Sequence, residues 1–87
     1  MTRLTLYTRP GCHLCDDMKA IVDEVADAHP VTLDEIDISR NHGLERRFGM
    51  EIPVLAHGAQ VIARTRTTRA ALATALGQIE RGREAGR

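Results

Sequence analysis

Aromatic side chains are nearly absent from this chain. Tyr7 and Phe48 are the only two among 87 residues, and there is no tryptophan. Proteins that bind single-stranded nucleic acid stack successive bases on such rings. Charge of one sign is not in excess either, because 12 basic residues balance 12 acidic residues. We therefore predict that the protein has no nucleic-acid partner and no bulk electrostatic attraction to a membrane surface.

Long hydrophobic runs are also missing. No stretch of the chain reaches the roughly 20 apolar residues that a membrane-spanning helix needs. The opening segment MTRLTLYTRPG contains no apolar run of signal-peptide length. We expect a cytoplasmic protein without a membrane partner. A chain of 87 residues has room for one domain with a small core.

Cysteine is scarce, and its two copies lie close together. Both are in the segment RPGCHLCDDM, at Cys12 and Cys15. In a reducing compartment such a pair is typically catalytic, redox-sensing or metal-binding. A zinc site with four ligands normally needs a second cysteine pair or an H-x₃₋₅-H pair, and the sequence has neither. A redox-active dithiol is the interpretation that this spacing favours, with a metal site and two inert core cysteines as alternatives.

Hydrophobic periodicity predicts seven secondary-structure elements. Strand patterns cover residues 4–8, 31–38, 52–56 and 61–63, and helical patterns cover residues 12–28, 39–49 and 69–79. The order is β-α-β-α-β-β-α, which indicates an α/β fold with a four-stranded mixed sheet and a parallel crossover between the first two strands.

Two finer features of this organisation can also be predicted. The alternation of the second strand slips between Leu33 and Ile36, which suggests a bulge or a late start. Residues 1–79 form a single domain in this interpretation. The charged, glycine-containing segment at residues 80–87 is predicted to be a flexible C-terminal tail.

The predicted start of the first helix gives the two cysteines different roles. With Cys12 at the first helical position, Cys15 lies one turn further along on the same side. Unpaired backbone N–H groups and the positive end of the helix dipole favour a thiolate at Cys12. Cys12 is therefore the candidate nucleophile and Cys15 the candidate resolving thiol. His13, between them, is a candidate modulator of the Cys12 pKa.

The segments YTRPGCHLC and IPV together resemble the dithiol motif and the cis-proline loop of glutaredoxin-like proteins in the thioredoxin-fold superfamily. The resemblance covers about residues 3–79 in matching element order. It implies a cis Ile52–Pro53 bond, where base rates alone favour trans. It also implies that Pro53 lies against the cysteines, that the Ile52 backbone faces an extended substrate, and that Arg9 contacts a substrate carboxylate, as a glutaredoxin lysine does with glutathione.

The chain departs from that family around the glutathione site. The Gly-Gly pair and acidic residue that hold the glutamyl end of glutathione align with Ala63-Arg64 and the segment 65–67. Side chains replace glycines there, and cations replace the carboxylate that would accept the glutathione ammonium. Glu51 also stands where threonine is usual. We therefore expect glutathione, or another low-molecular-weight thiol, to be used poorly if at all.

The sequence predicts a monomeric thiol–disulfide oxidoreductase that requires no cofactor or metal. Cys12 would attack a substrate disulfide and Cys15 would resolve the mixed disulfide. The expected partners are a disulfide-bearing protein or small thiol and a reductase that donates electrons. Two alternatives stay open. One is a copper- or zinc-handling CxxC protein, although copper chaperones run β-α-β-β-α-β, and the other is a redox-switched binding module without turnover.

Overall fold

A computed structural model describes residues 1–85 of the chain. Over these residues the elements are β1 (Thr2–Thr8), α1 (His13–Val25), β2 (Val31–Asp37), the 3-10 turn η1 (Ile38–Arg40), α2 (His42–Phe48), β3 (Val54–His57), β4 (Gln60–Arg64) and α3 (Arg69–Ala85). The predicted order β-α-β-α-β-β-α is confirmed, and it differs from the order of the copper chaperones. No helix in the described part of the chain is both long and apolar enough to cross a bilayer.

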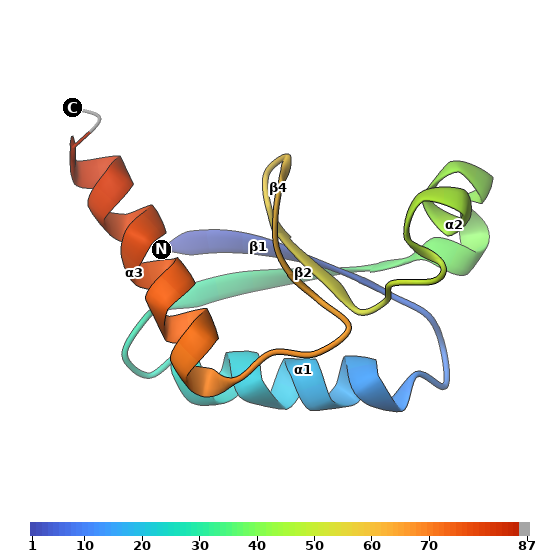
Figure 1. Ribbon diagram of the computed structural model, residues 1–87, viewed down its shortest axis with the longest axis horizontal. Helices are drawn as coiled ribbons and strands as arrows, with labels where there is room; N and C mark the ends of the chain where they lie inside the picture. Colours follow the sequence, from blue (N-terminus) through green and yellow to red (C-terminus); the bar gives the residue numbers. More distant parts are fainter. Residues whose placement is uncertain (86–87) are drawn as a thin grey trace.

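The four strands form one mixed sheet in the order β2-β1-β3-β4 (Figure 1). β1 pairs with β2 in parallel, as the helical crossover between them predicts, and the other two pairings are antiparallel. The hairpin between β3 and β4 turns at Gly58, which has a positive φ of 60°. Glycine adopts this conformation without steric cost, so the turn follows directly from the sequence.

Alternation along the two central strands produces two separate cores. Leu6 and Leu55 face each other across β1 and β3 and are completely buried in the larger core, which α1 and α3 cover. Their neighbours Tyr7 and Val54 point to the opposite face, where they contact a smaller core that includes Phe48 of α2. The helices therefore lie on both faces of the sheet, and α2 is held by the smaller core.

The predicted bulge in β2 is wrong. β1 and β2 pair without interruption from Thr2 with Val31 to Thr8 with Asp37. Leu33 packs against the larger core, whereas Ile36 points to the other face at the edge of the sheet and is 36% exposed. The slip in the hydrophobic pattern reflects this exposure of Ile36 and needs no extra residue.

The predicted tail from residue 80 is also wrong at its start, because α3 continues to Ala85. Residues 80–85 include good helix formers, and the Glu80 carboxylate lies 2.9 Å from Nδ1 of His29, which ties this turn to the loop between α1 and β2. Residues 86 and 87, the remainder of the predicted tail, lie outside the described residues. The Thr68 hydroxyl caps the start of α3, where it accepts a hydrogen bond from the Ala71 N–H at 3.1 Å.

Candidate active site

Cys12 and Cys15 form a disulfide at the start of α1, with their Cα atoms 5.2 Å apart. The helix begins at His13, one residue later than predicted, because Cys12 has extended backbone angles and is the N-cap. The Cys15 N–H points at Sγ of Cys12 at 3.1 Å. In the reduced protein the same N–H faces the position of a Cys12 thiolate, which is the environment that activates a thiol.

The two cysteines differ in their access to solvent. Cys12 is half-buried, whereas Cys15 is only 2% exposed and faces the core. The turn before Cys12 sets this geometry. Gly11 has a φ of 79°, which glycine adopts readily, and the Cys12 N–H donates to the Arg9 carbonyl at 3.3 Å. Cys12 is therefore more accessible from solvent than Cys15.

The loop before β3 has the predicted cis bond between Ile52 and Pro53. Pro53 is buried, and the half-buried Ile52 packs against the smaller core. The Thr65 N–H donates to the Pro53 carbonyl at 2.8 Å and to the Glu51 carbonyl at 3.1 Å. These bonds fix the loop on both sides of Ile52.

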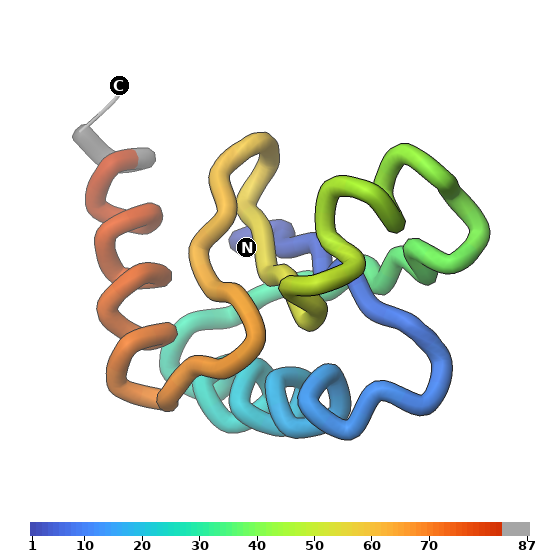
Figure 2. Tube along the Cα trace, turned by 45° about the vertical axis from the view of Figure 1, so that its right-hand side comes forward, coloured from blue at the N-terminus to red at the C-terminus, as the bar shows by residue number. Residues whose placement is uncertain are grey.

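Thr65 joins this loop to α1. Figure 2 shows the segments before β3 and after β4 side by side above α1, as Figure 1 does from another angle. Thr65, Arg66 and Thr67 line a cavity of about 210 Å³ together with Leu14 and three further residues of α1. The cis-proline loop and the dithiol helix are therefore linked through the segment after β4. That Pro53 lies against the cysteines stays a prediction.

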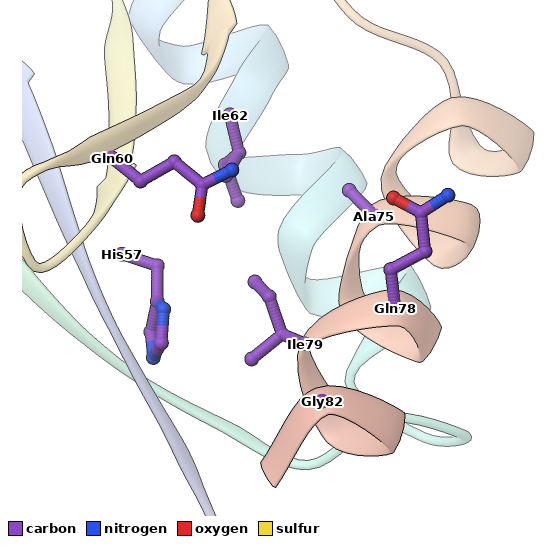
Figure 3. A pocket seen from close by; sticks show the side chains of 7 residues that line it. All are labelled: His57, Gln60, Ile62, Ala75, Gln78, Ile79 and Gly82. Carbon is purple, nitrogen blue, oxygen red and sulfur yellow. The ribbon is translucent and has the colours of Figure 1, made fainter. Parts of the chain in front are cut away.

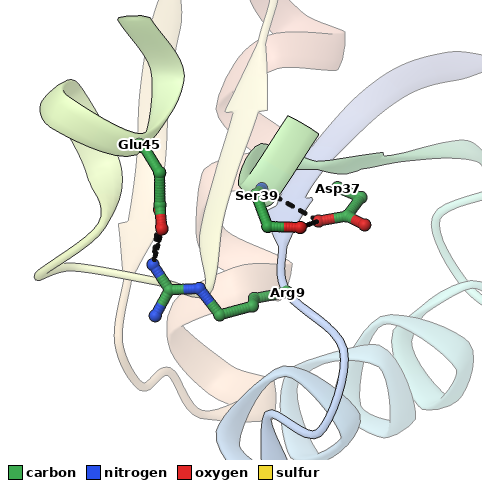
Figure 4. A network of polar contacts seen from close by, with 4 residues as sticks. All are labelled: Arg9, Asp37, Ser39 and Glu45. Carbon is green, nitrogen blue, oxygen red and sulfur yellow. Dashed lines mark hydrogen bonds and ion pairs between the residues drawn. The ribbon is translucent and has the colours of Figure 1, made fainter. Parts of the chain in front are cut away.

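Arg9 lies in the groove beside Cys12, but its guanidinium is already occupied. Both Glu45 oxygens accept from Nη2 of Arg9, with Oε2 at 2.6 Å (Figure 4). Arg9 and Cys12 line the same groove of about 320 Å³. The structure thus brings these two predicted site residues together, while Glu45 takes the place that a substrate carboxylate was expected to fill.

Three acidic side chains, Asp16, Glu35 and Asp37, also line the groove at Cys12. The Ser39 hydroxyl donates to Asp37 at 2.6 Å and the Ser39 N–H does so at 2.9 Å. These hydrogen bonds hold the pKa of Asp37 below its ordinary value. The Lys19 ammonium lies 3.3 Å from Glu35 and Nε of Arg40 lies 3.8 Å from Asp37, so two of the three charges have a cationic partner.

The two unusual residues near the cis-proline loop contact each other. Arg64 Nε lies 2.8 Å from a Glu51 carboxylate oxygen. Glu51 and Arg64 each appear in the sequence as a separate departure from the glutaredoxin pattern. In the structure they form one ion pair across the loop and the end of β4, so Arg64 too has an internal carboxylate partner.

Sequence reasoning missed Glu45 and the backbone role of Thr65. Glu45 is 36 residues from Arg9, and nothing in the local pattern of either segment indicates the pairing. The unusual backbone of Thr65 could have been suspected from the sequence, because Thr65 follows the position of the family's glycine pair. Its φ of 62° is a conformation that glycine favours and a β-branched residue rarely adopts. His13 is exposed at the first position of α1, and its effect on Cys12 stays a prediction.

A larger hollow, of about 490 Å³, lies away from the cysteines between the β3–β4 hairpin and α3 (Figure 3). Ile62 and Ile79 give it an apolar floor, and the His57 imidazole lies at its edge. Neither cysteine lines it, so it is separate from the cysteine pair. Over residues 1–85 no three His, Cys, Asp or Glu side chains are placed to hold a metal ion together.

The difference in access predicts different thiol reactivities. In the reduced protein near neutral pH, Cys12 should be alkylated much faster than Cys15, because Cys12 is half-buried at the helix start and Cys15 is enclosed. Peptide mapping by mass spectrometry after timed iodoacetamide quenches measures both rates. Equal labelling of the two thiols, or faster labelling of Cys15, would contradict this assignment of roles.

Comparison with known proteins agrees with the geometry. The protein XcR50 from X. campestris, in its X-ray structure, has a TM-score of 0.77 and 25% identity, covering 86% of this chain and 96% of its own. Ne2328 from Nitrosomonas europaea has a TM-score of 0.73 and 26% identity, covering 83% and 87%. A mutant thioredoxin from Halobacterium salinarum, 18% identical over 87% of this chain and 72% of its own, shares the fold with a TM-score of 0.59.

No curated protein sequence matches this chain. A family description does match it over most of its length. Residues 3–77 match the family described as "Glutaredoxin-like domain (DUF836)", which spans both cysteines, the cis-proline loop and most of α3. The close cysteine pair is consistent with redox chemistry on a thioredoxin-like fold. The chain therefore belongs to the glutaredoxin-like domain family.

Proposed function

We propose that this protein is a thiol–disulfide oxidoreductase in which Cys12 attacks and Cys15 resolves. The observation that carries the proposal is the disulfide at the start of α1, which joins an accessible N-cap cysteine to a buried partner one turn away. Two cysteines that are three positions apart and already within disulfide distance can exchange with a substrate disulfide without rearrangement of the fold.

The reaction has two exchange steps. The Cys12 thiolate attacks one sulfur of a substrate disulfide, forms a mixed disulfide and releases the other substrate sulfur as a thiolate that takes up a proton. The Cys15 thiolate then attacks Sγ of Cys12 and releases the second substrate thiol. Two electrons pass from the protein to the substrate, and a dithiol donor must return them.

The cis-proline loop is the proposed docking edge for an extended substrate. Thr65 holds the carbonyls on both sides of Ile52, so the backbone of this loop is fixed. A fixed backbone edge near a reactive thiol suits an extended polypeptide that pairs through main-chain hydrogen bonds. A protein disulfide is therefore the preferred substrate, with a protein reductase as electron donor.

Glutathione is a poor electron donor in this proposal. Its two carboxylates would compete with Glu45 for Arg9 and with Glu51 for Arg64. Its ammonium would meet Arg66 near the start of α3, at a cost of about 1 kcal/mol in a solvated site, or about fivefold in an equilibrium constant.

A comparison of donors tests the proposal. Reduction of a protein disulfide is followed with glutathione and its reductase, and separately with a thioredoxin-reductase system. We expect turnover above background with the protein donor and turnover that is at least about fivefold lower with glutathione. Absence of turnover with both donors and with dithiothreitol would reject the oxidoreductase function. Efficient turnover with glutathione alone would reject only the proposed donor.

A further inference from the structure

We infer that Glu45 is a positioning residue that selects substrates by charge, because it holds Arg9 away from any substrate carboxylate. The groove at Cys12 then favours disulfides whose neighbouring groups are neutral or cationic and disfavours those flanked by carboxylates. This inference rests on the proposed oxidoreductase function and adds the substrate class to it.

Glu45 supplies the Arg9 guanidinium with hydrogen-bond acceptors from within the chain. Both carboxylate oxygens of Glu45 accept from Arg9, and the two side chains are 39% and 32% exposed. Glu45 lies in the first turn of α2, where the helix dipole favours a negative charge. Figure 4 shows the Arg9 side chain extended from the loop after β1 toward α2. A substrate carboxylate would have to displace a partner that is covalently part of the protein.

The remaining charges in the groove have the opposite preference. With Arg9 neutralised by Glu45, the lining includes the carboxylates of Asp16, Glu35 and Asp37 beside Cys12. Lys19 lies 3.3 Å from Glu35 and Arg40 lies 3.8 Å from Asp37, so these two carboxylates have cationic partners, and Asp16 carries the unbalanced negative charge of the lining. A carboxylate beside the scissile disulfide is repelled by this net negative charge, whereas an ammonium is attracted to it.

Three small symmetric disulfides of nearly equal size separate charge from shape. Bis(2-hydroxyethyl) disulfide is neutral, cystamine is cationic and 3,3′-dithiodipropionate is anionic. The kcat/KM of the wild-type protein is measured for each with dithiothreitol as donor, and each value is divided by the rate at which dithiothreitol alone reduces that disulfide. We expect the order cationic, neutral, anionic. The spread should shrink as salt is added, because the groove is open to solvent.

The decisive variant is Glu45→Gln, which frees the Arg9 guanidinium. The ratio of anionic to neutral kcat/KM should rise about fivefold, the effect of one partly exposed ion pair. The double variant Arg9→Gln/Glu45→Gln should lose this rise. Glu24→Gln is the matched control, because Glu24 pairs with Arg69 at 3.4 Å near the far end of α1 and makes the same change in net charge. Its ratio should equal that of the wild type.

The outcomes separate this inference from the function on which it rests. A wild-type protein that does not reduce the neutral disulfide overturns the proposed function. A wild-type protein that reduces all three disulfides equally after normalisation overturns the charge selection. An equal rise in Glu45→Gln and Glu24→Gln, or a rise that persists without Arg9, would show that net charge acts rather than the Arg9–Glu45 contact.

Discussion

Cys12→Ser should release no thiol above background from bis(2-hydroxyethyl) disulfide in a stoichiometric assay without external reductant. In the same assay, reduced wild-type protein should release two thiols per protein molecule. A serine hydroxyl is not ionised at neutral pH and does not attack a disulfide, and Cys15 is 2% exposed. Cys15→Ser should release one thiol per molecule and retain the other half of the substrate as a mixed disulfide on Cys12. Thiol titration of the small-molecule fraction, after acid quenching and removal of the protein by ultrafiltration, and intact-protein mass spectrometry measure both quantities.

A control separates chemistry from folding in this experiment. Serine at the buried position 15 places a hydroxyl in the core, which costs about 1–3 kcal/mol without a hydrogen bond. Cys15→Ala removes the resolving thiol without that cost and should give the same single release. Two thiols released by either Cys15 variant would contradict the resolving role, and any stoichiometric release by Cys12→Ser would contradict the attacking role.

The local chemistry of the chain predicted most of the fold. Alternation or short apolar runs indicated all four strands, and in the structure Pro10-Gly11 and His29-Pro30 lie between elements. The errors concern ends and registers. α1 ends at Val25 rather than near residue 28, and β2 has no bulge at Ile36. A single strand pattern cannot tell an extra residue from an apolar side chain left at an edge, because that difference depends on the neighbouring strand.

The candidate site was predictable only where its residues are close in sequence. The Cys12–Cys15 pair followed from its spacing and the cis Ile52–Pro53 bond from the family resemblance, and the structure contains both. The partner of Arg9 could not be predicted, because Glu45 reaches it through the packing of α2 against the sheet. Long-range ion pairs depend on how helices pack against the sheet, and residue spacing within one segment does not contain that information.

The contact between Arg9 and Glu45 therefore depends on the smaller core, which holds α2 against the sheet. Phe48, at the end of α2, is 4% exposed and stacks on Tyr7 of β1 with ring centroids 4.5 Å apart. Only two other buried residues, Ile38 and Val54, belong to this cluster over the described residues. α2 has seven residues, too few to be stable as an isolated helix, so its position depends on this packing.

Phe48→Ala should lower the free energy of unfolding by about 3–5 kcal/mol, because truncation of a buried ring loses apolar contact and leaves a cavity in a small cluster. Urea unfolding followed by circular dichroism, with the disulfide kept reduced in both proteins, measures the difference. This is a large part of the roughly 5–15 kcal/mol that holds a typical domain together.

The same substitution should also change selectivity if α2 is what places Glu45 on Arg9. At a temperature where the variant stays folded, its ratio of anionic to neutral disulfide turnover should rise toward that of Glu45→Gln. Leu72→Ala is the matched control, because Leu72 is a buried residue of α3 in the larger core on the opposite face. It should destabilise the fold by about 2–5 kcal/mol and leave the ratio unchanged. Equal ratios in both variants would mean that Glu45 stays on Arg9 without the support of Phe48, and a loss below about 1 kcal/mol in Phe48→Ala would mean that the smaller core contributes little to the fold.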